Sequence, residues 1–151
     1  MKAAELTLGR TFAVSFEDGE DFLDALRVFC ETHDVKQGYL PMFVAAMRSV
    51  TVVGACDPGP DPNAPVWDTV SHAYVETFGV GTLAAGESGV SPHIHLSLGL
   101  KHEGAAARTS HLLGGEVQFL AELLVIEVLA PAMTRPVDAD MYGVPVLTYG
   151  A

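Results

Sequence analysis

Near its middle the chain reads Pro92-His93-Ile94-His95-Leu96-Ser97-Leu98-Gly99-Leu100, with apolar residues at every second position. Successive side chains of a β-strand point to opposite faces. The even-numbered residues from Ile94 to Leu100 would therefore form one apolar stripe, while His93 and His95 would share the other face. This alternation predicts a strand with one buried side and one side that presents imidazoles.

A third histidine follows in Ser110-His111-Leu112-Leu113-Gly114. If the chain turns back near Glu103-Gly104, a register that pairs residue 97 with residue 109 sets His111 opposite His95. Side chains that lie opposite each other on neighbouring strands are about 5 Å apart at Cβ. We therefore expect His93, His95 and His111 to converge, close enough to share one ion.

Three histidines are a chemically suitable ligand set for zinc or another divalent transition metal. Zinc binds neutral imidazole, and a site with three protein ligands keeps a fourth position open. A small molecule or an anion could occupy that position. The alternative is that the histidines line a solvated sheet face or form hydrogen bonds across a subunit contact. The remaining histidines, His33, His72 and His102, are expected to be structural or solvated.

Glu76 is the acidic residue that we expect to face the same site, because it is flanked by apolar residues in Tyr74-Val75-Glu76-Thr77-Phe78. A carboxylate beside a metal can act as a general base or hold a ligand histidine in one tautomer. It could equally accept hydrogen bonds from a neighbouring loop. Glu122 and Glu127 raise the same question, and for them the structural interpretation is favoured.

The composition predicts one domain that associates with itself. The chain has 151 residues, of which 49% are hydrophobic and only 18% charged, so apolar surface would remain to be covered in an oligomer. The net charge is −11, from 19 acidic and eight basic residues, and no two basic residues are adjacent. DNA binding takes much of its affinity from phosphate neutralisation, so this balance argues against it.

The cysteines and the hydropathy pattern predict a soluble cytoplasmic protein. Cys30 and Cys56 fit no metal-binding or redox spacing and are expected to be buried free thiols. The N-terminal residues lack the apolar core of a signal peptide. No apolar run approaches the roughly 20 residues of a membrane span.

Local patterns predict the remaining elements. A strand is expected over 11–16, a helix over 20–33, strands over 39–46 and 49–56, and two short strands within 66–83. Four prolines make 57–65 a surface loop, and 84–90 reads as a second loop. For 116–129 the apolar periodicity favours a helix, although Val125 to Leu129 is typical of a strand. The tail over 130–151 is expected to be mostly extended.

The order of segments over 38–129 resembles the PPC domain, which plants and prokaryotes share and whose bacterial stand-alone members are often labelled DNA-binding. The resemblance rests on Val75 to Leu83, the His93-Ile94-His95 strand, His111-Leu112-Leu113-Gly114, and Val117 to Val128 with Glu122. It implies an α+β fold, namely a mainly antiparallel sheet flanked by one or two helices, in a single domain that forms a homotrimer. It also implies that 116–129 is a strand, and that the three histidines form a cluster able to hold a metal.

Two features depart from the family pattern. Thr109-Ser110 replaces the Gly-Gly that usually precedes the third histidine, and the turn over 101–107 is longer. In plant members the DNA-binding label belongs largely to a separate Arg-Gly-Arg-Pro hook that enters the minor groove, and this chain has no Arg-Gly-Arg.

The leading hypothesis is a trimeric metal- or small-ligand-binding domain with a three-histidine site. If it is an enzyme, which the sequence leaves open, the simplest chemistry is metal-assisted hydrolysis or hydration with Glu76 moving a proton. The alternatives are a DNA-associated regulator and a structural trimerisation module without catalysis.

Overall fold

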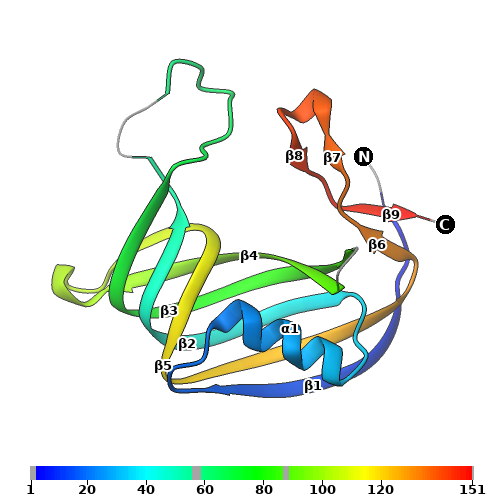
Figure 1. Ribbon diagram of the computed structural model, residues 1–151, viewed down its shortest axis with the longest axis horizontal. Coiled ribbons are helices and arrows are strands. Elements are labelled where there is room, and N and C mark those ends of the chain that lie inside the picture. The colour runs from blue at the N-terminus through cyan, green and yellow to red at the C-terminus, as the bar shows by residue number, and fades with distance from the viewer. Residues whose placement is uncertain (1–2, 56–58, 87–88, 151) are drawn as a thin grey trace.

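The protein is described by a computed structural model that covers residues 3–55, 59–86 and 89–150 (Figure 1). Most of the described chain is antiparallel strand, and one α-helix packs on it. The elements are β1 (Thr7–Glu17), α1 (Phe22–Thr32), β2 (Gly38–Val53), β3 (Thr69–Gly86), β4 (Gly89–Leu100), the 3-10 turn η1 (Lys101–Glu103), β5 (Ala106–Ala130), β6 (Ala132–Thr134), β7 (Val137–Asp138), the 3-10 turn η2 (Ala139–Met141), β8 (Val144–Pro145) and β9 (Thr148–Gly150).

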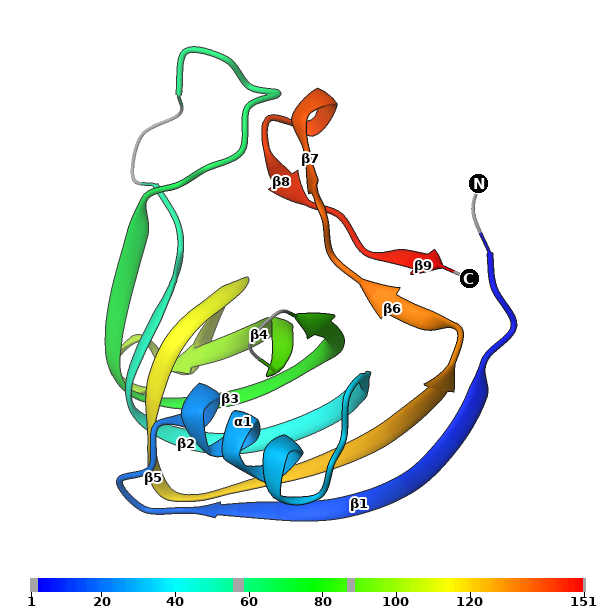
Figure 2. The same cartoon turned by 45° about the vertical axis from the view of Figure 1, so that its right-hand side comes forward.

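The sheet closes on itself because β5 pairs with three other strands. Its first part pairs with β4, its middle with β2 and its end with β1. Since β2 also pairs with β3, and β3 with β4, the strands β2, β3, β4 and β5 form a closed ring. Figure 2 shows how strongly the strands curve to achieve this. The predicted class, a mainly antiparallel sheet with one or two flanking helices, is confirmed with one α-helix.

The core lies between the inner face of the sheet and α1. The even-numbered residues of β4 from Ile94 to Leu100 are all buried, as the alternating pattern predicts. The helix begins after Asp21, whose carboxylate accepts hydrogen bonds from the first turn, and it buries Phe22 and Leu26. The ring of Phe22 lies 4.8 Å from that of Phe43 on β2. This contact anchors α1 over the curved sheet (Figure 1).

Two strands are longer than local patterns suggest, because each joins two expected strands. The two strands expected over 39–46 and 49–56 are one strand, β2, with an irregular register between Leu40 and Phe43. The two short strands expected within 66–83 are likewise one strand, β3, which runs to Gly86 and shortens the loop predicted over 84–90. The proline-rich loop is free of helix and strand over 59–65, and residues 56–58, including Cys56, lie outside the described residues.

The helix predicted over 116–129 from the apolar periodicity is wrong, because this segment forms the second half of β5. Ala45 pairs with Ala121 whereas Ala46 pairs with Gln118, so β5 carries two extra residues there. Phe119, within this bulge, has a φ of 68°. A bulge shifts the phase of an alternating strand. The buried residues Val117 and Ala121 are therefore four apart, which imitates a helical repeat.

The tail over 130–150 is extended, as predicted, and it folds back beside the closed sheet. β6 pairs in parallel with the end of β3, where Thr134 lies opposite Ala85, and β9 then pairs with β6. β7 and β8 form a separate two-stranded ribbon (Figure 2). Among the described residues, no helix has the length and apolar character needed to cross a membrane.

Candidate metal centre

The hairpin of β4 and β5 has the register predicted from the sequence. Ser97 pairs with Thr109, and His95 pairs with His111. His93 lies two residues before His95 on the same strand, so all three imidazoles project from one face. That face is the outer one, because the alternate residues of β4 are buried inside.

The three rings lie against one another. The ring centroids are 5.1 Å apart for His93 and His95, 4.8 Å for His93 and His111, and 5.3 Å for His95 and His111. One ring nitrogen from each residue lies within 4.8 Å of the other two. Nitrogens that share a tetrahedral zinc ion at 2.0–2.1 Å are about 3.4 Å apart, so small side-chain rotations would suffice.

The environment favours the neutral form of two of these imidazoles, those of His93 and His111. Burial, followed by the positive charges of Arg135, His111 and His95, lowers the pKa of His93 to about 4. Burial also lowers the pKa of His111, with smaller effects from His95 and Arg135. Metal ligation requires the neutral form. The number, type and protonation of these donors therefore fit a divalent transition metal.

Two residues that sequence reasoning missed lie beside the cluster. Thr82 of β3 pairs directly with His93 of β4, so both side chains share the outer face. Arg135, which follows β6, donates a hydrogen bond from Nη2 to Oγ1 of Thr82 at 2.6 Å. No spacing in the sequence connects these residues, because only the parallel pairing of β6 with β3 brings the tail to this place.

Glu76 is not part of the cluster. It lies on the outer face of β3 but pairs with Gly99, whereas His95 pairs with Val80. Four residues of extended strand separate the two positions, a distance of about 13 Å. The carboxylate of Glu76 is mostly exposed and forms an ion pair with Lys101 at 3.1 Å. Within this chain it is therefore not placed to act at the histidines.

The other candidate carboxylates and histidines also lie elsewhere. Glu122 is exposed, and Glu127 is buried in an ion pair with Arg10. His33 ends α1 and packs its ring 4.8 Å from that of Phe29. His102 is exposed in η1, and His72 lies in β3 opposite Val50.

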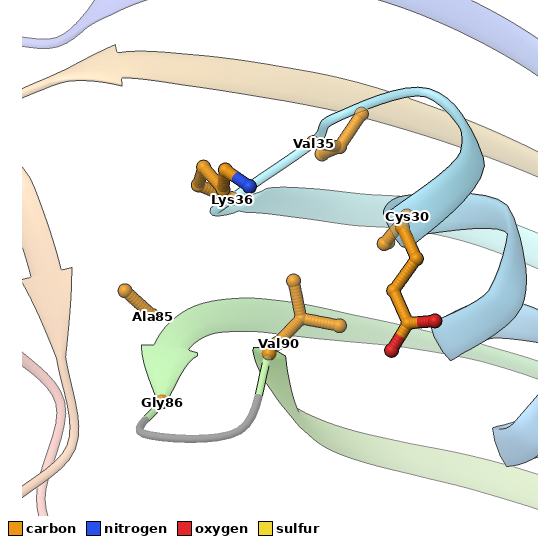
Figure 3. Close-up of a pocket in the computed structure, with 8 residues that line it drawn as sticks. Cys30, Val35, Lys36, Ala85, Gly86 and Val90 are labelled. Atoms are coloured by element: carbon orange, nitrogen blue, oxygen red, sulfur yellow. The ribbon is translucent and has the colours of Figure 1, made fainter.

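A separate cavity of about 190 Å³ lies between the end of α1 and the β3–β4 hairpin (Figure 3). Cys30, Val35 and Val90 are among its lining residues. Burial raises the pKa of the Cys30 thiol to about 11, so it stays protonated and unreactive. Cys30 is thus a buried free thiol, as predicted from the sequence.

The outer face also carries apolar side chains next to the histidines. Val80, the cross-strand partner of His95, is 54% exposed, and Phe78, two residues before it, is 63% exposed. Val44 lies opposite Phe78 on β2 and is also exposed. We refer to Val44, Phe78 and Val80 as the outer apolar patch. It continues the histidine cluster across the sheet.

Comparison with known proteins assigns the fold to a family. A family model of the Plants and Prokaryotes Conserved (PCC) domain matches residues 3–129. No curated protein matches the chain.

Three solved structures illustrate the similarity. A plant- and prokaryote-conserved (PPC) protein from Pyrococcus horikoshii has a TM-score of 0.82 and 19% identity, over 100% of this chain and 99% of its own. A metal-containing protein from Archaeoglobus fulgidus has a TM-score of 0.77 and 22% identity, over 98% and 99%. A candidate DNA-binding protein from Bacteroides thetaiotaomicron has a TM-score of 0.76 and 18% identity, over 95% and 97%. At such identities the likeness shows the shared fold.

Proposed function

Since the chain belongs to the Plants and Prokaryotes Conserved domain family, we propose that it is a homotrimer that binds a divalent metal ion through His93, His95 and His111. Zinc is the favoured ion, because it readily takes three neutral imidazoles and keeps a position for a further ligand. The observation that carries this proposal is the convergence of one ring nitrogen from each histidine to within 4.8 Å. A small molecule or an anion would take the remaining position.

The surroundings of the rings favour a metal site over a packing role. Within the described residues none of the three imidazoles takes part in a hydrogen bond, although histidines that serve a structural purpose usually do so. The lowered pKa values of His93 and His111 also reduce the charge repulsion that would otherwise separate the rings. When bound, the ion would supply Lewis-acid chemistry. The metal-containing neighbour from Archaeoglobus fulgidus supports this proposal.

The outer apolar patch supports association with further copies of the chain. Exposed Phe and Val side chains on neighbouring strands form the kind of surface that a subunit contact covers. Their position next to His95 would place the metal site at the edge of that contact. A neighbouring copy would then close a site that is open in one chain. The family resemblance supports three copies.

Metal analysis of untagged protein tests the proposal. We expect one zinc per chain in the wild type, and at least a tenfold weaker uptake in His95→Ala with the circular dichroism spectrum unchanged. His102→Ala is the matched control, because His102 is exposed and lies outside the cluster. Full zinc content in His95→Ala, or none in the wild type, would refute the metal site and leave the structural trimerisation module as the better account.

A role at DNA is the second candidate, because the neighbour from Bacteroides thetaiotaomicron is named as a candidate DNA-binding protein. The electrostatics oppose it. Among the described residues, five of the seven basic side chains form ion pairs with carboxylates: Arg10, Arg27, Lys36, Arg48 and Lys101. These bases are already neutralised within the protein and would contribute little to a phosphate contact.

A further inference from the structure

Arg135 stands apart from the other basic residues of the protein. It is half-buried, and among the described residues no carboxylate forms an ion pair with it. Its Nε atom is shielded from solvent and has no hydrogen-bond partner within the part of the chain that the structure describes. Burying a guanidinium donor without an acceptor is costly, so such an arrangement is expected where an additional acceptor completes the site.

The position of Arg135 follows from a row of three outward side chains. Tyr39 of β2 pairs with Thr82 of β3, which pairs with His93 of β4. Neighbouring strands are about 4.8 Å apart, so this row spans about 10 Å. Arg135 hydrogen-bonds to Thr82 at the centre of the row. The guanidinium is thus held between the histidine cluster and Tyr39.

The tail contributes a second residue to this place. Tyr149 of β9 donates to or accepts from the hydroxyl of Tyr39 at 2.9 Å. Burial lowers the pKa of Arg135, and Tyr149 lies near enough to raise it by a smaller amount. β6 and β9 pair with each other. The tail thus brings the Arg135 guanidinium to Thr82 and the Tyr149 hydroxyl to Tyr39, both in the row that ends at His93.

Among the described residues, the charges that act on His93 are all positive, although the whole chain carries −11. Arg135 adds one positive charge, and a divalent ion held by neutral imidazoles would add two. Arginine presents planar N–H donors that match carboxylate and phosphate oxygens. Burial raises the pKa of the Tyr39 hydroxyl to about 12, so this group supplies no compensating negative charge at neutral pH. A negatively charged ligand would supply the compensating charge.

We propose that Arg135 is a binding residue for the oxyanion of a small-molecule ligand, a carboxylate or a phosphate, which the protein holds against the three-histidine site. Thr82 is a positioning residue that orients the guanidinium. The proposal deepens the metal-site function and rests on it, because the ligand would contact both Arg135 and the ion. It names small anionic metabolites as the ligand class. Residue 135 lies beyond the part that the family model matches.

Titration calorimetry of the full chain with three compounds tests the proposal: lactate, its uncharged amide lactamide, and inorganic phosphate. In the zinc-loaded wild type we expect lactate or phosphate to bind at least ten times more tightly than lactamide. Arg135→Gln should abolish that preference while one zinc per chain is retained. Whichever anion binds more tightly identifies the oxyanion.

Two further variants keep the result interpretable. Arg108→Gln is the matched control, because Arg108 is an exposed arginine on the β4–β5 hairpin, and it should bind anions like the wild type. Arg135→Lys retains the positive charge but lacks the planar N–H donors of the guanidinium. Its anion affinity should therefore lie between the affinities of the wild type and of Arg135→Gln. It also replaces Arg135→Gln if that variant does not fold.

Separate measurements distinguish this inference from the metal proposal. Absence of zinc from the wild type refutes the metal site alone, and the same titrations on metal-free protein then decide whether Arg135 binds anions. Anion binding that is equal in Arg135→Gln and wild type would overturn the inference. Failure of lactate and phosphate to bind the wild type better than lactamide would also overturn it.

Discussion

Glu127 is a buried carboxylate whose role is clear from its contacts. Only 8% of its side chain is exposed, and it forms an ion pair with Arg10 at 2.7 Å. It also accepts hydrogen bonds from the backbone N and the Nε of Arg10. The side-chain and backbone hydrogen bonds of Arg10 lower the pKa of Glu127 to about 2. This pair ties β1 to β5 at the edge of the sheet.

We predict that Glu127→Gln destabilises the protein by about 1–3 kcal/mol at pH 7. The folded-state pKa lies below the ordinary value of 4.5, so the stabilisation is complete above about pH 4.5 and is lost as the pH falls towards 2. Urea unfolding at fixed protein concentration from pH 7 to pH 2.5 measures it. The exposed Glu122→Gln is the control. A difference between variant and wild type that does not shrink at acid pH would contradict the assignment.

Gly79 determines how closely two elements of the sheet can approach. A Cβ at this position would lie 2.5 Å from the carbonyl oxygen of His95 and 2.5 Å from the ring of Phe43. Both neighbours are fixed, one as backbone of β4 and the other as a core ring of β2. The absence of a side chain at Gly79 therefore lets β3 lie close to both the backbone of β4 and the ring of Phe43.

We predict that Gly79→Ala lowers the free energy of unfolding by about 1–3 kcal/mol, because the extra methyl group overpacks this site. Gly114→Ala is the matched control, since a Cβ there meets no atom within 4 Å and its φ is not positive. Thermal unfolding of both variants measures the difference. Equal stability of the two would show that β3 and β4 can separate more easily than the packing indicates.

Strictly alternating segments could be predicted at the level of elements, whereas segments with bulges could not. The stripe in β4 and the return to His111 determine the hairpin and its register, because both depend on local alternation. The bulge at Phe119 breaks that alternation and imitates a helix. The sequence also does not predict that β2 and β3 are each continuous. Local patterns do not show where a long curved strand changes its pairing partner.

The residues of the candidate site also differ in how well the sequence predicts their positions. His93, His95 and His111 lie on one hairpin, so sequence separation and strand geometry suffice to bring them together. Thr82 and Arg135 meet only through the fold of the tail, and no sequence pattern relates them. The apolar neighbours of Glu76 predict that it lies at the site, but Val75 faces the core and Phe78 belongs to the outer apolar patch.

At the scale of the whole molecule, we predict that the wild type is a trimer at micromolar concentration. Phe78→Asp should dissociate it, because a carboxylate would be placed in the outer apolar patch. Light scattering coupled to size-exclusion chromatography gives the mass. Val28→Asp on α1 is the control, because Val28 is also exposed, at 60%, but lies away from the patch. A monomeric wild type would refute the prediction.

We also predict no specific DNA binding near physiological salt. The net charge of −11 and the internal neutralisation of most basic residues leave too few free cations to release counterions from DNA. Fluorescence anisotropy with duplex DNA over a range of salt concentrations checks this. A submicromolar dissociation constant that weakens steeply with salt would show that a basic surface forms in the oligomer.

The length of β5 has a consequence for how the chain acquires its structure. Thr7 pairs with Ala130, so the first strand remains without its partner until almost the entire family domain has left the ribosome. Strands β2 and β4 also pair with β5, so their hydrogen bonding is incomplete until β5 is present. Folding should therefore be completed only once β5 has emerged, in milliseconds to seconds, as is typical of proteins dominated by distant strand pairings. A ribosome that stalls before β5 would hold a nascent chain with open strand edges, which chaperones would have to shield.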